Sequence, residues 1–383
     1  MKSSRTADRT RILDALEQLA QFGVPSPGSA GIFDVGTAAF VQYFEEEILN
    51  DLVAAGGATC KIVEGAYGSG KTHLLQLLED SALKRGFAVV RTDLSQSLNL
   101  EDWHLITKHI LENIEYCASS GVVRSLPRVL EALVRDGIAN TSALATGSLP
   151  HSGFARAMSL ACSNTLSAEG RLLLNRYLSG ERISAAMLRS EDVPHVKHPL
   201  SRRNAELLLK TVLVALHRLG LPGTLLLFDE MEKTFTIKRS APSRRVVAGA
   251  NLLRRLIDGA ANGALVGTAI VFAVLPDFVD QCALAYPALG QRLSRSPRDG
   301  PVSWRWPILP LDTIATEQDP RDFLVALVDR HADVLKQCGV DLNGTRPRMM
   351  EAGTRTLARH AGSDYRRHLV KSIAQLSLSE MAE

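Results

Sequence analysis

Short apolar runs alternate with amphipathic stretches along much of this chain. Five runs are rich in β-branched and aromatic residues and predict strands, at residues 58–64, 87–93, 224–228, 269–275 and 302–309. Apolar positions at helical spacing predict helices between several of these strands, at 71–84, 101–117 and 246–260. Strands that alternate with helices are typical of a parallel, doubly wound sheet. The pattern therefore predicts an α/β fold.

Other stretches predict helices outside this sheet. A helix over 6–22 leads into a Pro/Gly loop, and a second helix over 36–55 precedes the first strand. Residues 118–218 contain helical and loop sequence without a convincing strand, which indicates an insertion. From residue 319 onward the pattern is helical, as in a separate lid.

A glycine-rich segment separates the first predicted strand from the helix after it. Its residues form a complete phosphate-binding loop of the Walker-A type: Gly65, Ala66, Tyr67, Gly68, Ser69, Gly70, Lys71, Thr72 and His73. Glycines let successive backbone N–H groups point inward around a phosphate at the positive end of the following helix. Lys71 is expected to neutralise β- and γ-phosphate oxygens, and the Thr72 hydroxyl to bind Mg²⁺. The chain is thus predicted to be a P-loop NTPase that binds a nucleoside triphosphate and Mg²⁺.

Two carboxylates follow the most apolar strand. The run 224–228 leads into Asp229 and Glu230, at the end of a parallel strand where α/β sheets bind ligands. We expect this strand to lie beside the one before the phosphate loop, with Asp229 holding Mg²⁺ and Glu230 polarising the attacking water, as in Walker-B sites. Asp93, at another strand end, is a weaker candidate for the same neighbourhood.

The end of the next strand departs from what rapid hydrolysis favours. Its residues Val274, Leu275 and Pro276 include no Asn, Thr or Ser that could sense the γ-phosphate. Either Asp277 or a water takes that role, or hydrolysis is slow.

Arginines supply positive charge to the transition state of phosphoryl transfer. The candidates form two groups: Arg292, Arg295 and Arg298 after the fourth strand, which could reach a neighbouring subunit's nucleotide, and Arg366 and Arg367 in the lid, which could act in cis. Arg254 and Arg255, in the middle of a helix, are expected at the surface or at an interface. For each arginine a solvated side chain is the alternative. The base is expected to contact apolar residues of the N-terminal region, namely Ile32, Phe33 and Val35.

These motifs divide the chain into five parts. They are an N-terminal helix with the adenine-side loop (1–35), the first half of the NTPase domain (36–117), the helical insertion (118–218), the second half of the NTPase domain (219–312) and the C-terminal helical lid (313–383).

Two further clusters leave alternatives open. Lys238, Arg239, Arg244 and Arg245 form a basic stretch that either contacts nucleic-acid phosphates or is simply solvated. Trp304 and Trp306 alternate along the last predicted strand, where core packing is favoured over stacking on bases. His195 and His198 have no further ligands at metal-binding spacing, so no metal other than nucleotide Mg²⁺ is predicted.

Composition narrows the class of protein. The 383 residues are 45% hydrophobic and 22% charged, with a formal net charge of +3, which excludes wholesale disorder and a strongly basic nucleic-acid coat. The five cysteines contain no CxxC pair, which favours free thiols over a zinc site. The polar N-terminus and the lack of a run of about 20 apolar residues predict a soluble, cytoplasmic protein without membrane partners.

Several segments in order resemble one known family. They are GVPSPG, EGAYGSGKTHLLQLLEDSAL, LPGTLLLFDEMEK, RRLIDG, LPDF and YPALGQRL. Together they resemble the ATP-binding protein of bacteriophage-exclusion (BREX) defence systems, which is similar to AAA+ ATPases of the origin-recognition and helicase-loader type. The resemblance covers most of the chain.

The resemblance implies an ATPase with a C-terminal helical lid that acts on DNA or on a DNA-bound partner such as a helicase or methyltransferase. It also implies a homo-oligomer. Lys71, Thr72, Asp229 and Glu230 match motif positions of the family, whereas Leu275 stands where the family tends to have Thr. Arg292, in the segment QRL, corresponds to an arginine that acts between subunits. The alternative to an ATPase is a nucleotide-gated scaffold with little turnover.

Overall fold

The structure is a computed structural model that describes residues 2–94, 98, 102–145, 149–163, 165–230, 244–293, 303–316, 319–340, 344–360, 362 and 364–382. Its centre is a seven-stranded sheet in the order β4-β3-β2-β5-β6-β1-β7. The strands are β1 (Ala58–Glu64), β2 (Ala88–Asp93), β3 (Glu115–Ala118), β4 (Gly121–Arg124), β5 (Thr224–Asp229), β6 (Thr268–Val274) and β7 (Ile308–Pro310). The pairs β2–β5, β5–β6, β6–β1 and β1–β7 are parallel, whereas β2–β3 and β3–β4 are antiparallel. The mixed α/β class predicted from the sequence is confirmed.

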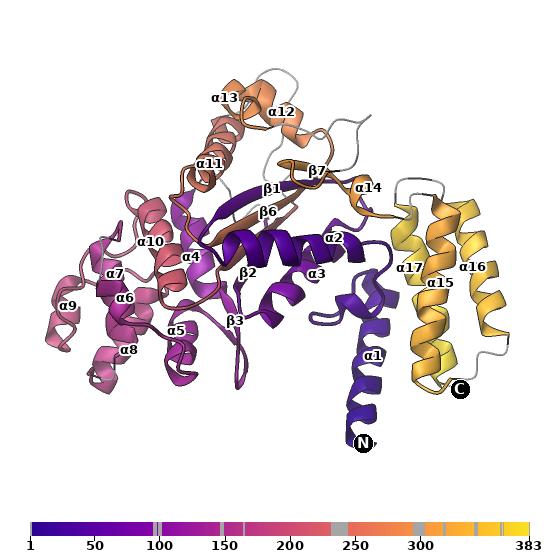
Figure 1. Cartoon of the computed structure of the whole chain (residues 1–383), viewed down its shortest axis with the longest axis horizontal. Coiled ribbons are helices and arrows are strands. Elements are labelled where there is room, and N and C mark those ends of the chain that lie inside the picture. The colour runs from indigo at the N-terminus through magenta and orange to yellow at the C-terminus, as the bar shows by residue number, and fades with distance from the viewer. Residues whose placement is uncertain are drawn as a thin grey trace.

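Both faces of the sheet are covered (Figure 1). Side chains alternate along β5, with Leu226 and Phe228 in one apolar cluster and Leu225 and Leu227 in another. The first cluster lies under six helices: α4 (Trp103–Asn113), α5 (Leu126–Arg135), α7 (Ser152–Ala161), α10 (Ala205–Arg218), α11 (Arg244–Ala261) and α12 (Phe278–Ala285). The second cluster lies under α2 (Ala38–Tyr43), the π-helical segment η2 (Phe44–Val53) and α3 (Lys71–Lys84). Burial on both faces explains why β5 is apolar from Leu225 to Phe228, between Thr224 and its terminal acid.

The C-terminal segment that the sequence predicts to be a lid is helical. Helices α15 (Pro320–Gln337), α16 (Thr345–Arg359) and α17 (Tyr365–Ala382) share an apolar cluster with α1 (Lys2–Phe22), in which Leu16 and Leu19 meet Leu369 and Ile373. The N-terminal helix therefore packs with the C-terminal lid, although the two are more than 300 residues apart in the sequence.

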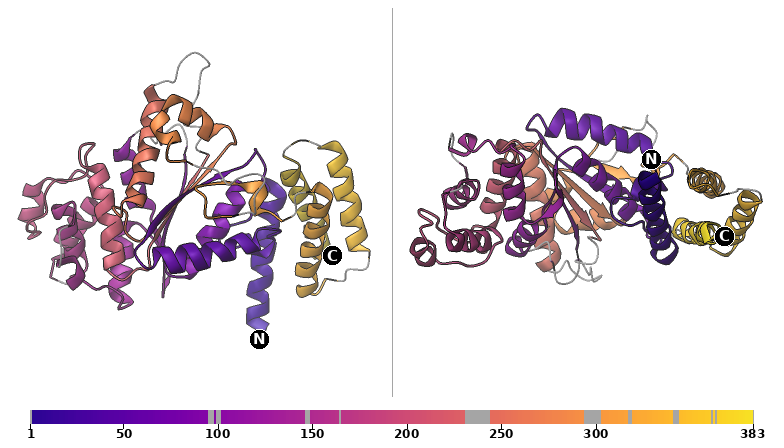
Figure 2. Two further views of the ribbon diagram at one scale, coloured as in Figure 1. Left: turned by 45° about the horizontal axis from the view of Figure 1, so that its top comes forward. Right: turned by 90° about the horizontal axis from the view of Figure 1, so that it is seen from below.

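The insertion and the lid lie at opposite ends of the molecule, with the sheet between them (Figure 2). The remaining short helices are η1 (Ala30–Ile32), α6 (Ser142–Ala145), α8 (Ala168–Leu178), α9 (Ala185–Ser190), α13 (Pro287–Gly290) and α14 (Leu311–Ile314).

Three expectations about the sheet are wrong. Residues 118–218 were expected to begin without a strand, yet β3 and β4 form a hairpin there, in which Tyr116 and Ala118 are buried and Gly121 has a φ of 111°. Four-residue strands at a sheet edge give too short an alternation to be recognised in the sequence. Consequently the helix expected over 101–117 ends at Asn113.

The last predicted strand is also much shorter than expected. Only Ile308–Pro310 forms β7, whereas Trp304 and Trp306 lie in turns. The buried Lys61 ammonium donates hydrogen bonds to the carbonyls of Trp304, Arg305 and Trp306, at 2.9, 2.8 and 3.1 Å, so these carbonyls bind a side chain rather than a strand. The Trp304 ring packs edge-on against Phe40, which fits the expected core packing of this residue.

The third error concerns strand order. The strand that ends in Asp229 was expected beside β1, but β6 lies between them. The helix α3, which follows β1, still reaches the end of β5, because Thr72 in its first turn forms a hydrogen bond with Asp229.

Candidate nucleotide-binding site

The loop after β1 has the backbone geometry that a phosphate cradle needs. Gly68 and Gly70 have φ values of 75° and 105°, in the left-handed region where a side chain is strained. A Cβ at Gly65 would lie 2.6 Å from Ser69 Oγ, and the Gly65 N–H donates a hydrogen bond of 3.0 Å to Val274 O at the end of β6. The loop is thus tied to the sheet and opens directly into the N-terminus of α3.

Lys71 and Thr72, the first residues of α3, face the same space. Lys71 is only 9% exposed, and its Nζ donates to Gly65 O at 2.7 Å and to Ala66 O at 3.0 Å. The Thr72 hydroxyl donates a hydrogen bond of 2.7 Å to Asp229 Oδ2. The two predicted halves of the site, the phosphate loop and the strand-end acids, therefore meet, although Thr72 and Asp229 are 157 residues apart.

Asp229 and Glu230 end β5 in two different environments. Asp229 is 2% exposed, and burial raises the pKa of its carboxyl group, against the lowering effect of the hydrogen bonds from Thr72 and the Glu230 N–H. Glu230 adopts a φ of 55°, an uncommon value for a residue with a side chain, and its N–H donates to Asp229 Oδ1 at 2.9 Å. Such backbone strain accompanies functional sites often enough to support the pairing of these two acids.

A cavity of about 340 Å³ unites these groups. It is lined by both acids, by the loop and first turn of α3, and by apolar side chains of the N-terminal region and lid; the lining residues include Leu19, Val24, Phe33, Val35, Tyr67, Gly68, Ser69, Gly70, Lys71, Thr72, His73, Asp229, Glu230, Leu275, Phe323 and Leu327. Phe33 and Val35 thus lie where the sequence places the base. Ile32 does not line this cavity; its carbonyl accepts a hydrogen bond of 2.7 Å from Arg330 Nε on the other side of the segment.

The lid reaches the loop through α17. Arg367 donates a hydrogen bond of 2.9 Å to the Tyr67 hydroxyl and lies over its ring, while Arg366 lies 4.9 Å from the centre of the Phe323 ring. A Cβ at Gly68 would lie 2.9 Å from Asp364 at the start of α17. Arg366 and Arg367, predicted to act in cis, both line the cavity; their role toward a nucleotide stays a prediction.

His73 introduces a residue that sequence analysis missed. Its Nε2 lies 3.1 Å from Asp34 Oδ1, which also accepts a hydrogen bond of 2.7 Å from the Thr37 hydroxyl. Burial would raise the pKa of Asp34, but His73, Thr37 and Arg330 outweigh it and hold this pKa below its ordinary value. A charged Asp34 in the N-terminal region is therefore linked to His73, two residues after Lys71. No sequence signal identified it, because a single acid in a loop has no pattern.

The other candidate residues lie away from the cavity. Arg292 forms an ion pair with Asp258 and donates to Ala288 O at 2.7 Å. Arg254 pairs with the same Asp258, at 3.0 Å, and Arg255 pairs with Glu206. None of the three lines the cavity, and neither do Asp93 and Asp277.

Several candidates fall outside what the structure describes. Arg295, Arg298, Lys238 and Arg239 lie in the segments between the described residues, and the side chains of Arg244 and Arg245 are likewise not described. Within the described residues, no group of three or more His, Cys, Asp and Glu side chains could hold a metal ion. In the same part of the chain, no helix has the length and apolar character to cross a membrane. All five cysteines are free thiols.

The fold and the cavity define a mixed α/β protein with a candidate phosphate-binding loop. A family model described as "BREX system ATP-binding protein BrxC/D" matches residues 5–168 and 154–370, and the chain belongs to this family. Membership indicates a role in phage defence together with ATP binding. No curated protein and no solved structure matches the chain.

Proposed function

We propose that this protein is an AAA+-like P-loop ATPase that hydrolyses ATP in the cavity between β1, β5 and the lid, and that it acts on DNA or on a DNA-bound partner during phage defence. The observation that carries this proposal is the 2.7 Å hydrogen bond between Thr72 and Asp229, because it joins a hydroxyl after a phosphate-type loop to a buried strand-end acid. These are the oxygen ligands that Mg²⁺ prefers.

The residues around the cavity fit ATP and Mg²⁺. Gly68 and Gly70 take left-handed φ values that a residue with a side chain would strain to adopt. Lys71 lies at the start of α3, where phosphate charge is favoured. Thr72 and Asp229 would hold Mg²⁺, which supplies charge neutralisation to the phosphate oxygens. Phe33 and Val35 offer an apolar surface to the base.

Glu230 is the group proposed to activate water. It lines the cavity directly after Asp229, and a carboxylate in this position accepts a proton from, or orients, an attacking water. Arg366 and Arg367 are proposed to supply cis charge from the lid. Arg292 stays a proposal for an arginine acting between subunits of a homo-oligomer; in that role its ion pair with Asp258 must open.

A nucleotide-gated scaffold is the second candidate. Leu275 lines the cavity at the end of β6, and an apolar side chain there cannot donate a hydrogen bond to a γ-phosphate. Such a protein would bind ATP and change shape or assembly state with little turnover. Other proteins of the defence system are proposed as partners in either case, and we propose a cytoplasmic location.

A single-turnover assay on Glu230→Gln separates the two candidates. The amide keeps the shape of the side chain but cannot accept a proton, so we expect hydrolysis to fall about 100-fold or more while ATP stays bound. Glu169→Gln, on the exposed surface of α8 and outside the cavity, is the matched control and should hydrolyse ATP at the parent rate. Equal hydrolysis by Glu230→Gln and parent would refute the role of Glu230, and no single-turnover hydrolysis by the parent, with or without DNA, would favour the scaffold.

A further inference from the structure

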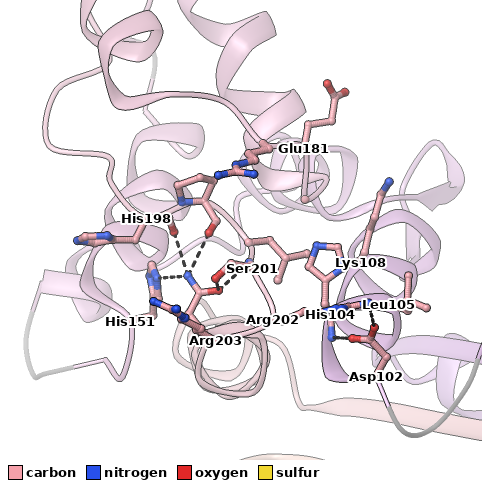
Figure 3. Close-up of a pocket in the computed structure, with 15 residues that line it drawn as sticks. Asp102, His104, Leu105, Lys108, His151, Glu181, His198, Ser201, Arg202 and Arg203 are labelled. Carbon is pink, nitrogen blue, oxygen red and sulfur yellow. Dashed lines mark hydrogen bonds and ion pairs between the residues drawn. The ribbon is translucent and has the colours of Figure 1, made fainter.

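A wide groove lies between the helical insertion and the neighbouring helix α4, and we call it the insertion groove (Figure 3). Its volume is about 1320 Å³, and it lies between the first turns of α4 and the loop that leads into α10. It shares no lining residue with the nucleotide cavity.

The charge of this groove is positive. Four cationic side chains line it (Lys108, Arg182, Arg202 and Arg203), against the two carboxylates Asp102 and Glu181. Both carboxylates are already paired, Asp102 with Arg202 at 3.1 Å and Glu181 with Arg176 at 2.8 Å. Lys108 pairs with Glu112 at 3.7 Å, so two of the four cations are already in ion pairs. Arg182 and Arg203 are exposed and form no ion pair within the described part of the chain. The side chains of His104, His151 and His198 complete a lining rich in donors.

Several hydrogen bonds hold the loop that presents two of these arginines. The Asn204 amide accepts hydrogen bonds from the Ser201 N–H and hydroxyl, both at 2.8 Å, and donates one of 3.0 Å to Pro199 O (Figure 3). The buried Tyr177 donates from its hydroxyl to Lys197 O at 2.9 Å. His198, next in the chain, has a φ of 58°. The backbone at Arg202 and Arg203 is therefore held in place before any ligand binds, which lowers the ordering cost of binding.

The exposure of these cations decides which anion they suit. The Arg202 side chain is 83% exposed, and an exposed ion pair with a small anion is worth only about 0–1 kcal/mol. A polyanion engages several such cations at once and releases its condensed counterions, so its affinity grows with the number of contacts. Cations spread along an open groove fit a chain of phosphates rather than a single one.

From this geometry we infer that the insertion groove binds the phosphate backbone of DNA. The inference rests on the DNA-directed part of the proposed function and gives that function a surface. The position of the groove also links it to the nucleotide cavity. Helix α10 begins at the groove and leads into β5, which ends in Asp229 and Glu230.

The test compares two doubly substituted proteins. Arg182→Gln/Arg203→Gln removes two groove cations, and Arg128→Gln/Arg359→Gln removes two exposed arginines that do not line the groove. Both pairs change the net charge equally and leave buried contacts intact. Binding of fluorescein-labelled duplex DNA is measured by anisotropy over a series of salt concentrations, with basal ATP hydrolysis recorded on the same preparations.

The groove variant should bind DNA about tenfold more weakly at low salt, and the slope of log affinity against log salt should fall by about 2, one for each lost phosphate contact. The control pair should match the parent. Equal weakening of both variants, or of neither, overturns the groove while DNA binding by the parent still supports the proposed function. A parent that binds no DNA overturns the groove and leaves the proposed ATPase only its second target, a DNA-bound partner. Groove-dependent DNA binding by a parent that does not hydrolyse ATP leaves the groove established and rejects the ATPase.

Discussion

The nucleotide cavity and the insertion groove use positive charge in opposite ways. In the cavity, Lys71 is 9% exposed and Asp229 is 2% exposed, each with hydrogen-bond partners at 2.7 Å. In the groove, Arg182 and Arg203 are exposed and lack such partners within the described residues. Buried charges interact strongly and only in one geometry, whereas exposed charges interact weakly but add up along a polyanion. The first arrangement favours one small ligand, and the second favours a long one.

Removing one buried cation should have the largest effect. Lys71→Ala should weaken nucleotide binding by roughly 3–4 kcal/mol, several hundred-fold, because a desolvated charge partner of the phosphates is lost. Its affinity for DNA should not change. The readout is titration with a fluorescent ATP analogue, and Lys84→Ala, at the exposed far end of the same helix, is the control. Unchanged nucleotide affinity in a folded Lys71→Ala protein would rule out the phosphate loop.

Salt concentration should affect DNA binding more strongly than nucleotide binding. Between about 50 and about 200 mM salt, DNA affinity should fall about 100-fold if four groove cations contact phosphates. Nucleotide affinity should fall less than about threefold, since buried charges are screened less than exposed ones. Both affinities are measured in the same buffers. A steeper salt dependence for the nucleotide than for DNA would contradict the contrast drawn here.

Asp229 tests the cost of burying a charge. Asp229→Asn should weaken the apparent affinity for Mg²⁺ in nucleotide binding about tenfold, since a neutral amide binds the cation less well. The same change should leave the melting temperature equal or about 2 °C higher, because the buried carboxylate charge is costly in the apo protein. Magnesium titrations and thermal unfolding measure the two effects. A large drop in melting temperature would mean that the charge is stabilising.

The pH dependence of this carboxyl group has a defined sign. Burial raises the pKa of Asp229, so the folded protein binds a proton here more readily than the unfolded chain does. Its contribution to the free energy of unfolding is therefore largest at low pH, below the unfolded value, and is lost as the pH rises through the raised pKa. Magnesium-dependent nucleotide affinity should change in the opposite sense and fall as the pH is lowered toward that pKa. Asp229→Asn should abolish both trends.

The smallest change in nucleotide affinity is expected from a substitution at Tyr67, an exposed residue of the cavity. Tyr67 is 62% exposed and accepts the Arg367 hydrogen bond of 2.9 Å. Tyr67→Phe keeps the ring under the guanidinium but removes the acceptor, so nucleotide affinity should change by less than about threefold. Hydrogen exchange of α17 measures whether the lid loosens. A large loss of affinity would show that this contact closes the site rather than merely touching it.

Local patterns in the sequence were enough to predict the loop, the helix over residues 71–84 and the apolar strand before Asp229. Each is set by neighbours in the chain: left-handed glycines, a helical period of apolar positions, and a continuous run buried on both faces. That Thr72 and Asp229 lie close together was also expected, because both residues lie at the carboxyl ends of parallel strands, at the same edge of the sheet.

The strand order, the edge hairpin and the insertion groove depend on long-range contacts that local sequence patterns do not contain. The insertion of β6 between β1 and β5, the β3–β4 hairpin and the turn at Trp304 depend on partners far away in the sequence, such as the Lys61 ammonium that binds three carbonyls. Asp34 beside His73 and Arg367 on Tyr67 are likewise long-range contacts between loops and helices that share no motif. The insertion groove is the clearest case. Its cations come from separated segments, and their approach results from the packing of α4, α7 and α10 around one apolar cluster, a long-range arrangement that local periodicity does not encode.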